Sequence, residues 1–178
     1  SSLVDNPVGT LITSEENIME QAVISGIAHN KDEAKLSLIG VPDEPGIAFK
    51  ILKPISTANI EVDMIVQSVS AREGLTNFAF TVHRNDFVGA SNILGHLRKE
   101  LGAMAIQSDD KVVKVSLVGI GMRSHAGIAA KMFEVLHGEN INIQMISTSE
   151  IKISVVIDEK YLELAVRSLH AAFELDKE

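Results

Sequence analysis

The chain has 178 residues and a mass of 19.2 kDa, which is enough for one large domain or two small ones. Hydrophobic residues make up 46% of the chain and charged residues 22%, so a folded core is expected and disorder as the dominant state is excluded. The net charge of −8 and the aromatic content of 4% argue against a nucleic-acid-binding surface, and the absence of cysteine excludes disulfides, thiol catalysis and thiolate metal sites.

The predicted elements follow a regular order along the chain. Residues 1–19 are expected to form an N-terminal extension or linker, and the start at Ser1 without an initiator Met indicates an excised or processed chain. Hydrophobic periodicity then predicts β-type segments at 22–28, 36–41, 60–66, 78–82 and 103–106, with helices at 47–55 and 87–101. In the second half it predicts strands at 115–118, 141–146 and 151–157, with helices at 128–136 and 162–173.

The second half of the sequence repeats the first. Lys35–Val41 is echoed by Lys114–Ile120, and Asn59–Ile65 is echoed by Asn140–Ile146. The complete first copy has the order βαββαβ, which is the plan of ferredoxin-like domains. The repeat therefore predicts two such domains in tandem.

The second copy ends before a fourth strand. A three-stranded sheet would leave an open edge, so we expect the missing strand to come from residues 22–28, which precede the first copy and are unused by it. The resulting prediction is an α+β fold of two ferredoxin-like βαββαβ domains, the first inserted into the second. The first domain would span 34–109, and the second 20–33 plus 110–178.

The loop Val41–Gly46 offers a place for a small ligand. It precedes a predicted helix, whose first backbone N–H groups carry partial positive charge and bind carboxylate or phosphate. Gly46 would permit close approach to the amides of residues 46 to 48, and Asp43 would pair with an ammonium group. A free amino acid carries both charges. The alternative is that Asp43 is a helix cap or a turn residue.

Other kinds of site find little support in the sequence. Gly119 and Gly121 follow a strand but lack the third glycine of a dinucleotide-binding loop, and no phosphate-binding loop or nucleophile elbow occurs. The six histidines are scattered, so neither a metal site nor catalytic residues are predicted. No segment reaches the roughly 18 apolar residues of a membrane span, and no secretion signal is visible, so we expect a cytoplasmic protein without membrane contact.

Several individual residues have a structural interpretation. His96 and His170 occupy equivalent helix positions in the repeat, and Asp109–Asp110 is interpreted as a solvated linker between the copies. The four methionines that fall in or beside predicted elements are expected to fill the core: Met64, Met104, Met132 and Met145.

The doubled βαββαβ plan and three segments of the sequence together resemble the tandem ACT-domain regulatory region of aspartokinase (aspartate kinase). They are the loop Val41–Gly46, the run Asn59–Gln67 and the run Gly138–Ser154. The resemblance extends over essentially the whole chain. The stretch from Met19 also resembles the point where separately translated β subunits of aspartokinase begin.

The resemblance implies a set of effector-binding residues. Threonine in many members of the family, and lysine in others, would be held by the first copy, with three residues of the second copy contributing across an interface: Asp43, Gly46, Ile47, Ala48 and Gln67, together with Asn140, Ile141 and Asn142. The second copy has no acid that matches Asp43. A second effector site there would use Met122, Ser124, His125, Thr148, Ser149 and Glu150.

The resemblance also implies a mechanism and partners. Effector binding would shift paired ACT domains, in a homodimer, and so inhibit an attached aspartokinase catalytic domain or α subunit. No cofactor is expected in this chain, because ATP and Mg²⁺ would belong to that catalytic part. The chain itself is expected to carry no kinase chemistry while forming part of a phosphotransferase.

Three rival interpretations remain open on the residues alone. The repeat could be a ligand-free ACT-type dimerisation module of another enzyme of amino-acid metabolism. It could be a small enzyme on the ferredoxin-like plan, such as an acylphosphatase, but its first loop lacks the arginine needed for phosphate. It could be an RNA-binding sheet, which its acidity and few aromatic residues disfavour.

Overall fold

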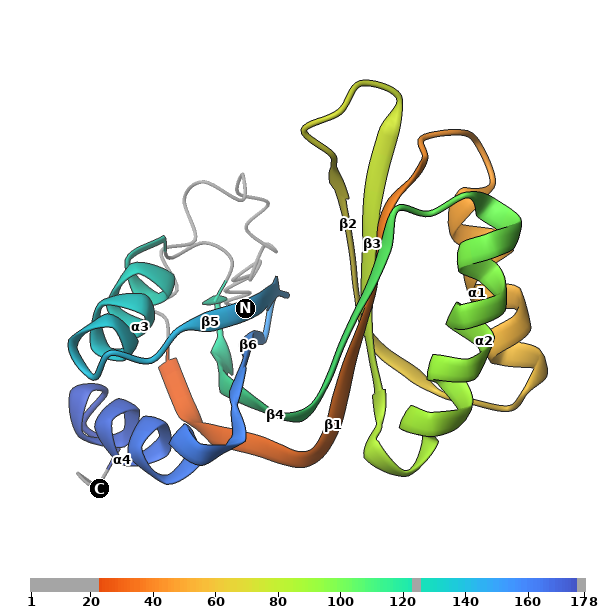
Figure 1. The fold of residues 1–178 in the computed structure, drawn as a ribbon. Helices are drawn as coiled ribbons and strands as arrows, with labels where there is room; N and C mark the ends of the chain where they lie inside the picture. The colour runs from red at the N-terminus through yellow and green to blue at the C-terminus, as the bar shows by residue number, and fades with distance from the viewer. Residues whose placement is uncertain (1–22, 123–125, 176–178) are drawn as a thin grey trace, which may run out of the picture.

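The computed structural model describes residues 23–122 and 126–175 (Figure 1). The elements in chain order are β1 (Val23–Pro42), α1 (Ile47–Thr57), β2 (Val62–Val69), β3 (Leu75–His83), η2 (Arg84–Asp86), α2 (Phe87–Leu101), β4 (Ala105–Ile120), α3 (Ala126–Gly138), β5 (Ile143–Thr148), β6 (Lys152–Asp158), η4 (Glu159–Tyr161) and α4 (Leu162–Ala172). In this part of the chain the strands form a six-stranded antiparallel sheet with the order β2-β3-β1-β4-β6-β5.

Two long strands, β1 and β4, run through both structural units. The second part of β1 pairs with β3, where Leu38 lies opposite Phe78, and the first part pairs with β4, where Ile27 lies opposite Leu117. The segment expected to complete the sheet of the second unit therefore does so. This pairing confirms the interlocked fold, in which the first unit is inserted into the second, whereas the domain bounds given above stay a prediction.

The prediction of separate short strands was wrong at two places. Residues 23–28 and 36–41 belong to the single strand β1, whereas residue 22 lies outside the described residues. Segments 103–106 and 115–118 correspond to the single strand β4, which begins at Ala105. Asp109–Asp110 therefore lies inside a strand and is not a linker. Polar residues interrupt the hydrophobic pattern where the paired strands β1 and β4 pass from one unit to the other, a region that we call the crossing. The backbone hydrogen bonds between the two strands continue there through shifts of register, which a sequence pattern does not reveal.

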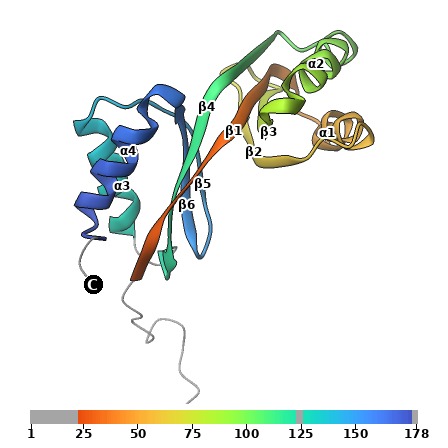
Figure 2. The ribbon, with the colours of Figure 1, turned by 90° about the horizontal axis from the view of Figure 1, so that it is seen from below.

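Helices cover the outer faces of the two units (Figures 1 and 2). Helix α1 buries Ile47, Ile51 and Ile55, at the spacing that predicted it, and packs with α2 over the first core. Helices α3 and α4 close a second core around Leu117, Leu136 and neighbouring apolar residues. Within the described part, no helix is long and apolar enough to cross a membrane.

Three of the four methionines fill the core as expected. Met132 is buried in the second core, and Met64 and Met145 meet in a small third cluster between the units. Met104 departs from the prediction, because 43% of it is exposed. It lies over Gly40, whose φ of +65° and absent Cβ allow this approach: a Cβ there would come within 2.6 Å of the Met104 sulfur.

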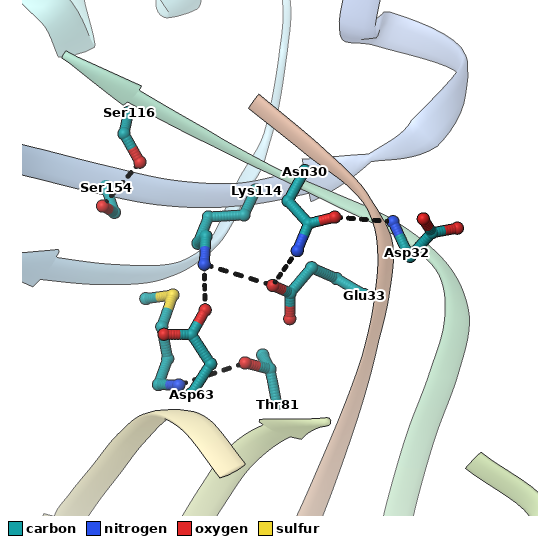
Figure 3. A network of polar contacts seen from close by, with 9 residues as sticks. Asn30, Asp32, Glu33, Asp63, Thr81, Lys114, Ser116 and Ser154 are labelled. Carbon is teal, nitrogen blue, oxygen red and sulfur yellow. Dashed lines mark hydrogen bonds and ion pairs between the residues drawn. The ribbon is translucent and has the colours of Figure 1, made fainter. Parts of the chain in front are cut away.

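Polar side chains also tie the two units together where the long strands cross (Figure 3). Lys114 on β4 pairs with Asp63 on β2 and lies 3.2 Å from Glu33 on β1. Asn30 donates a hydrogen bond of 3.0 Å to the same Glu33 oxygen, whereas Glu33 Oε2 has no hydrogen-bond partner among the described residues. Residues far apart in the sequence therefore meet in one ionic cluster.

Candidate functional site

The loop between β1 and α1 presents backbone amides and a carboxylate at one end of the first unit. Gly46 occupies the N-cap position of α1 with φ of +92°, and no side chain caps the helix. Asp43 is exposed, and its amide donates to the carbonyl of Gly74 at 2.9 Å, which anchors the loop to the β2–β3 turn. The alternative in which Asp43 caps α1 is therefore not what the structure contains.

The amides at the start of α1 are not all available to a ligand. The Ile47 N–H is directed to the Glu44 carbonyl at 3.2 Å, and its side chain is buried in the first core. The Ala48 N–H makes no hydrogen bond to another described residue. Of the amides predicted to hold an anion, the Ile47 amide is thus engaged within the loop, whereas the Ala48 amide remains usable at the positive end of the helix.

Gln67 lies at the same end of the first unit. On β2 it pairs with Phe78 of β3, which in turn faces Leu38 of β1. Residues opposite each other in an antiparallel sheet point to the same face, and Phe78 and Leu38 belong to the core beneath the helices. Gln67 therefore points to the helix side of the sheet, at its outer strand.

Asn140, Ile141 and Asn142 lie in the second unit, between α3 and the outer strand β5. Asn140 adopts a left-handed conformation, φ +57°, and its amide donates to the His137 carbonyl at 2.9 Å. Asn59 adopts the same conformation after α1, with φ +56°. The recurrence of Asn in the repeat thus has a structural cause, since Asn tolerates this conformation at a helix end. Ile141 is buried in the second core, whereas Asn142 is exposed.

The two groups of predicted effector residues do not meet within one chain. Although β2 and β5 stand at opposite edges of the sheet, they approach each other, because Met64 of β2 and Met145 of β5 belong to one buried cluster. Gln67, however, points to the helix side of the sheet, and no hydrogen bond or ion pair between described residues joins it to Asn140, Ile141 or Asn142. The prediction placed the second group across an interface, which is compatible with this separation.

The proposed second site is built differently from the first. Met122 stands at the position that corresponds to Asp43 in the repeat, but its side chain is buried in the second core. Its amide donates to the Glu150 carbonyl at 3.1 Å, as the Asp43 amide does to Gly74. Ser149 uses its hydroxyl group within its own turn, where it accepts from the Lys152 amide, while Thr148 is exposed at the end of β5. Ser124 and His125 lie outside the described residues.

The ionic cluster at the crossing escaped the sequence analysis. The repeat held a signal for it, because Lys35 aligns with Lys114 and Asp63 aligns with Gln144. Lys114 reaches Asp63, and Lys35 likewise donates to Gln144 Oε1 at 3.2 Å. Each unit therefore sends the equivalent lysine to the equivalent strand of the other unit. Burial lowers the pKa of Lys35, an effect that the nearby charge of Asp109 opposes.

Comparison with known proteins shows which domains and which proteins this chain is similar to. Residues 36–102 and 115–173 each match a model of the ACT domain. The chain is 68% identical over 169 residues to an aspartate kinase of Pseudomonas fluorescens (strain SBW25) and 46% identical over 173 residues to an aspartokinase of Helicobacter pylori (strain 26695). These alignments cover 94% and 95% of this chain but only 41% and 42% of those proteins, so the chain spans about two fifths of their length.

Solved structures share the whole architecture. A chain from the crystal structure of aspartokinase alpha and beta subunits is 55% identical, with a TM-score of 0.79 over 85% of this chain and 99% of that chain. The ligand-free regulatory subunit of aspartate kinase from Thermus thermophilus is 39% identical, with a TM-score of 0.78 over 84% of this chain and 98% of that one.

Proposed function

The chain belongs to the aspartokinase family, as the regulatory part built of two ACT domains, and from this premise we propose that it binds threonine, lysine or both and thereby mediates feedback inhibition. One observation carries the proposal. In the first unit, the exposed Asp43 lies in the loop that leads to the Ala48 amide at the start of α1, and Gln67 points to the helix side of the sheet.

These groups complement a free amino acid. The α-carboxylate would lie against the positive end of α1 and accept from the Ala48 amide, and Gly46 leaves room for its approach because a Cβ there meets nothing within 4 Å. The α-ammonium group would pair with Asp43. The Gln67 amide both donates and accepts hydrogen bonds, so it suits the hydroxyl group of threonine or the ammonium group of lysine.

We propose that a second copy of the chain completes this site. β2 is an outer strand with unpaired backbone groups and exposed apolar side chains, of which Val69 is 83% exposed. β5 is the opposite outer strand and follows directly after Asn140–Asn142. In a two-fold homodimer that sets β2 of one chain beside β5 of the other, Asn140, Ile141 and Asn142 of the partner subunit would face the amino acid, and the contact would be made twice.

The bound effector would act on the aspartokinase catalytic part, whether attached to this chain or carried by an α subunit. Inhibition requires that the effector binds the inactive arrangement more tightly than the active one, and couplings of this kind amount to about 1 to 3 kcal/mol. Phosphoryl transfer to aspartate, with its ATP and Mg²⁺, is assigned to the catalytic part.

A second effector site in the second unit would need a different set of contacts. Because the buried Met122 replaces the carboxylate, an ammonium group would have to be held by Glu150 on the neighbouring turn, with Thr148 and Ser149 beside it and Ser124 and His125 from the preceding loop. Asymmetry between the units favours the first unit as the principal sensor.

Isothermal titration with threonine and with lysine tests the proposal. In Asp43→Asn the affinity should fall by about 10- to 100-fold, because a charge-assisted contact worth roughly 1.5 to 3 kcal/mol is lost. Glu61→Gln, which removes an exposed acid of the same unit, is the matched control and should leave the affinity unchanged. Equal affinities of wild type and Asp43→Asn would contradict the site, and a dimer that binds neither amino acid would identify a ligand-free dimerisation module.

A further inference from the structure

A groove of about 480 Å³ lies in the second unit between α4 and the first part of β1. Its basic lining residues are Lys31 and Arg167, flanked by His29 and His170, and its apolar floor includes Leu162 and Val166. We propose that this groove binds a small organic anion, a carboxylate or a phosphate ester with a short apolar portion. The site would be separate from the effector site of the first unit.

The charge of the groove is opposite to that of the protein. The chain carries a net charge of −8, yet the groove places Lys31 and Arg167 against one acid, Glu163. Among the described residues no ion pair involves Lys31 or Arg167, so the part of the chain that the structure describes does not neutralise their charges. Two cations without ion-pair partners create a local positive potential on this acidic protein, and that potential attracts anions to the groove.

The internal repeat supplies a comparison for the groove. Strand pairing places Lys31 where the first unit has Asp110, because Ile27 opposite Leu117 corresponds to Ile106 opposite Leu38. The same helix alignment that equates His170 with His96 places Arg167 where the first unit has Ile93. The first unit thus has the same fold here but an acid and an apolar residue in place of the two cations. The cations are therefore not required by the fold.

The position of the groove also leaves it open to a ligand. The first part of β1 pairs with β4, and no other described strand lies along its second edge. The volume falls within the range of small-molecule sites, and a lining that combines cations with apolar side chains suits a ligand that has both charged and apolar parts. Arg167 offers a planar pair of donors that matches carboxylate and phosphate oxygens.

The test uses two probes that carry a short apolar portion, isovalerate for the carboxylate and isobutyl phosphate for the phosphate ester. Each is titrated into the whole chain and followed by NMR of labelled protein and by calorimetry. Binding of either probe, with shifts at Val166 and Ala171, is expected, and the two arms show which oxyanion is preferred. Lys31→Gln and Arg167→Gln should each weaken binding by up to about fivefold, as expected for exposed ion pairs. Raising the salt concentration from 50 to 300 mM should weaken it further.

Lys99→Gln is the matched control, because it removes an exposed cation from the corresponding helix of the first unit and should not affect binding. The absence of shifts with both probes would overturn the proposal. Equal losses in Lys99→Gln and Lys31→Gln would overturn it as well, since they would indicate attraction to the overall charge alone. A groove that ignores both probes and binds only an acidic peptide would be a protein-docking surface, which also contradicts the proposal.

Discussion

Replacing Lys114 with Met should destabilise the protein by about 3 kcal/mol. The side chains of Lys114 and Glu33 are only 15% and 3% exposed, so removal of the lysine leaves a buried carboxylate whose remaining partner is Asn30. Breaking a buried ion pair from one side costs roughly 3 to 5 kcal/mol. The lower figure applies because Asp63, the other partner of the lysine, is 45% exposed and regains water when the lysine is gone.

Urea unfolding followed by circular dichroism measures this loss, and an unchanged slope with denaturant shows that the same surface is exposed. Lys111→Met, on the same strand but exposed, should change the free energy of unfolding by less than about 0.5 kcal/mol. Adding Glu33→Gln to Lys114→Met should recover about 1 to 2 kcal/mol, because no charge then stays buried. A loss below about 1 kcal/mol in Lys114→Met, with no recovery in the double variant, would refute this reasoning.

Two further predictions concern single positions. Gly40→Ala should lower the free energy of unfolding by about 1 to 3 kcal/mol, because the residue has φ of +65° and its new Cβ would meet the Met104 sulfur. Adding Met104→Ala should relieve the contact with the sulfur but not the backbone strain. Full recovery of the melting temperature in the double variant would contradict the presence of that strain. Burial lowers the pKa of Lys35 from 10.5, so the unfolded state binds more protons just below pH 10.5 and the contribution of this residue to stability rises with pH there. Unfolding of Lys35→Met between pH 7 and 10 should lack that rise, and parallel pH profiles for the variant and the wild type would contradict it.

The sequence was informative where a periodic pattern meets a buried surface. Ile47, Ile51 and Ile55 repeat at helical spacing because α1 buries one face, and this spacing alone predicts the helix. The repeat also predicts the interlocked topology. The second copy lacks its fourth strand, and another part of the chain has to provide that strand to cover the open edge of the sheet. Both inferences depend on short-range patterns or on counting elements.

The crossing of the long strands could not be predicted in this way. β1 and β4 continue through polar stretches, where Glu33 and Lys114 form an ion pair although they are more than 80 residues apart in the sequence. An isolated acid or lysine in a sequence has the appearance of a surface residue, and only its spatial partner explains its burial. For the candidate site, the loop with Asp43 was recognisable, but the use of the Ile47 amide by Glu44 depends on the loop conformation.

The cross-unit contacts limit how an effector signal can leave the first unit. β2 carries both Gln67, at the proposed effector site, and Asp63, which Lys114 of β4 holds. The equivalent contact in the repeat joins Lys35 of β1 to Gln144 of β5, and here the lysine donates to a neutral amide. Met64 and Met145, which follow Asp63 and Gln144 in the sequence, belong to one buried apolar cluster. A displacement of β2 alone would therefore break an ion pair and open an apolar contact, whereas a displacement of the two units together preserves both. Packed elements move as rigid bodies for this reason. The structure therefore favours a signal that shifts the whole chain relative to neighbouring subunits or domains over one that bends the chain between its own two ACT domains.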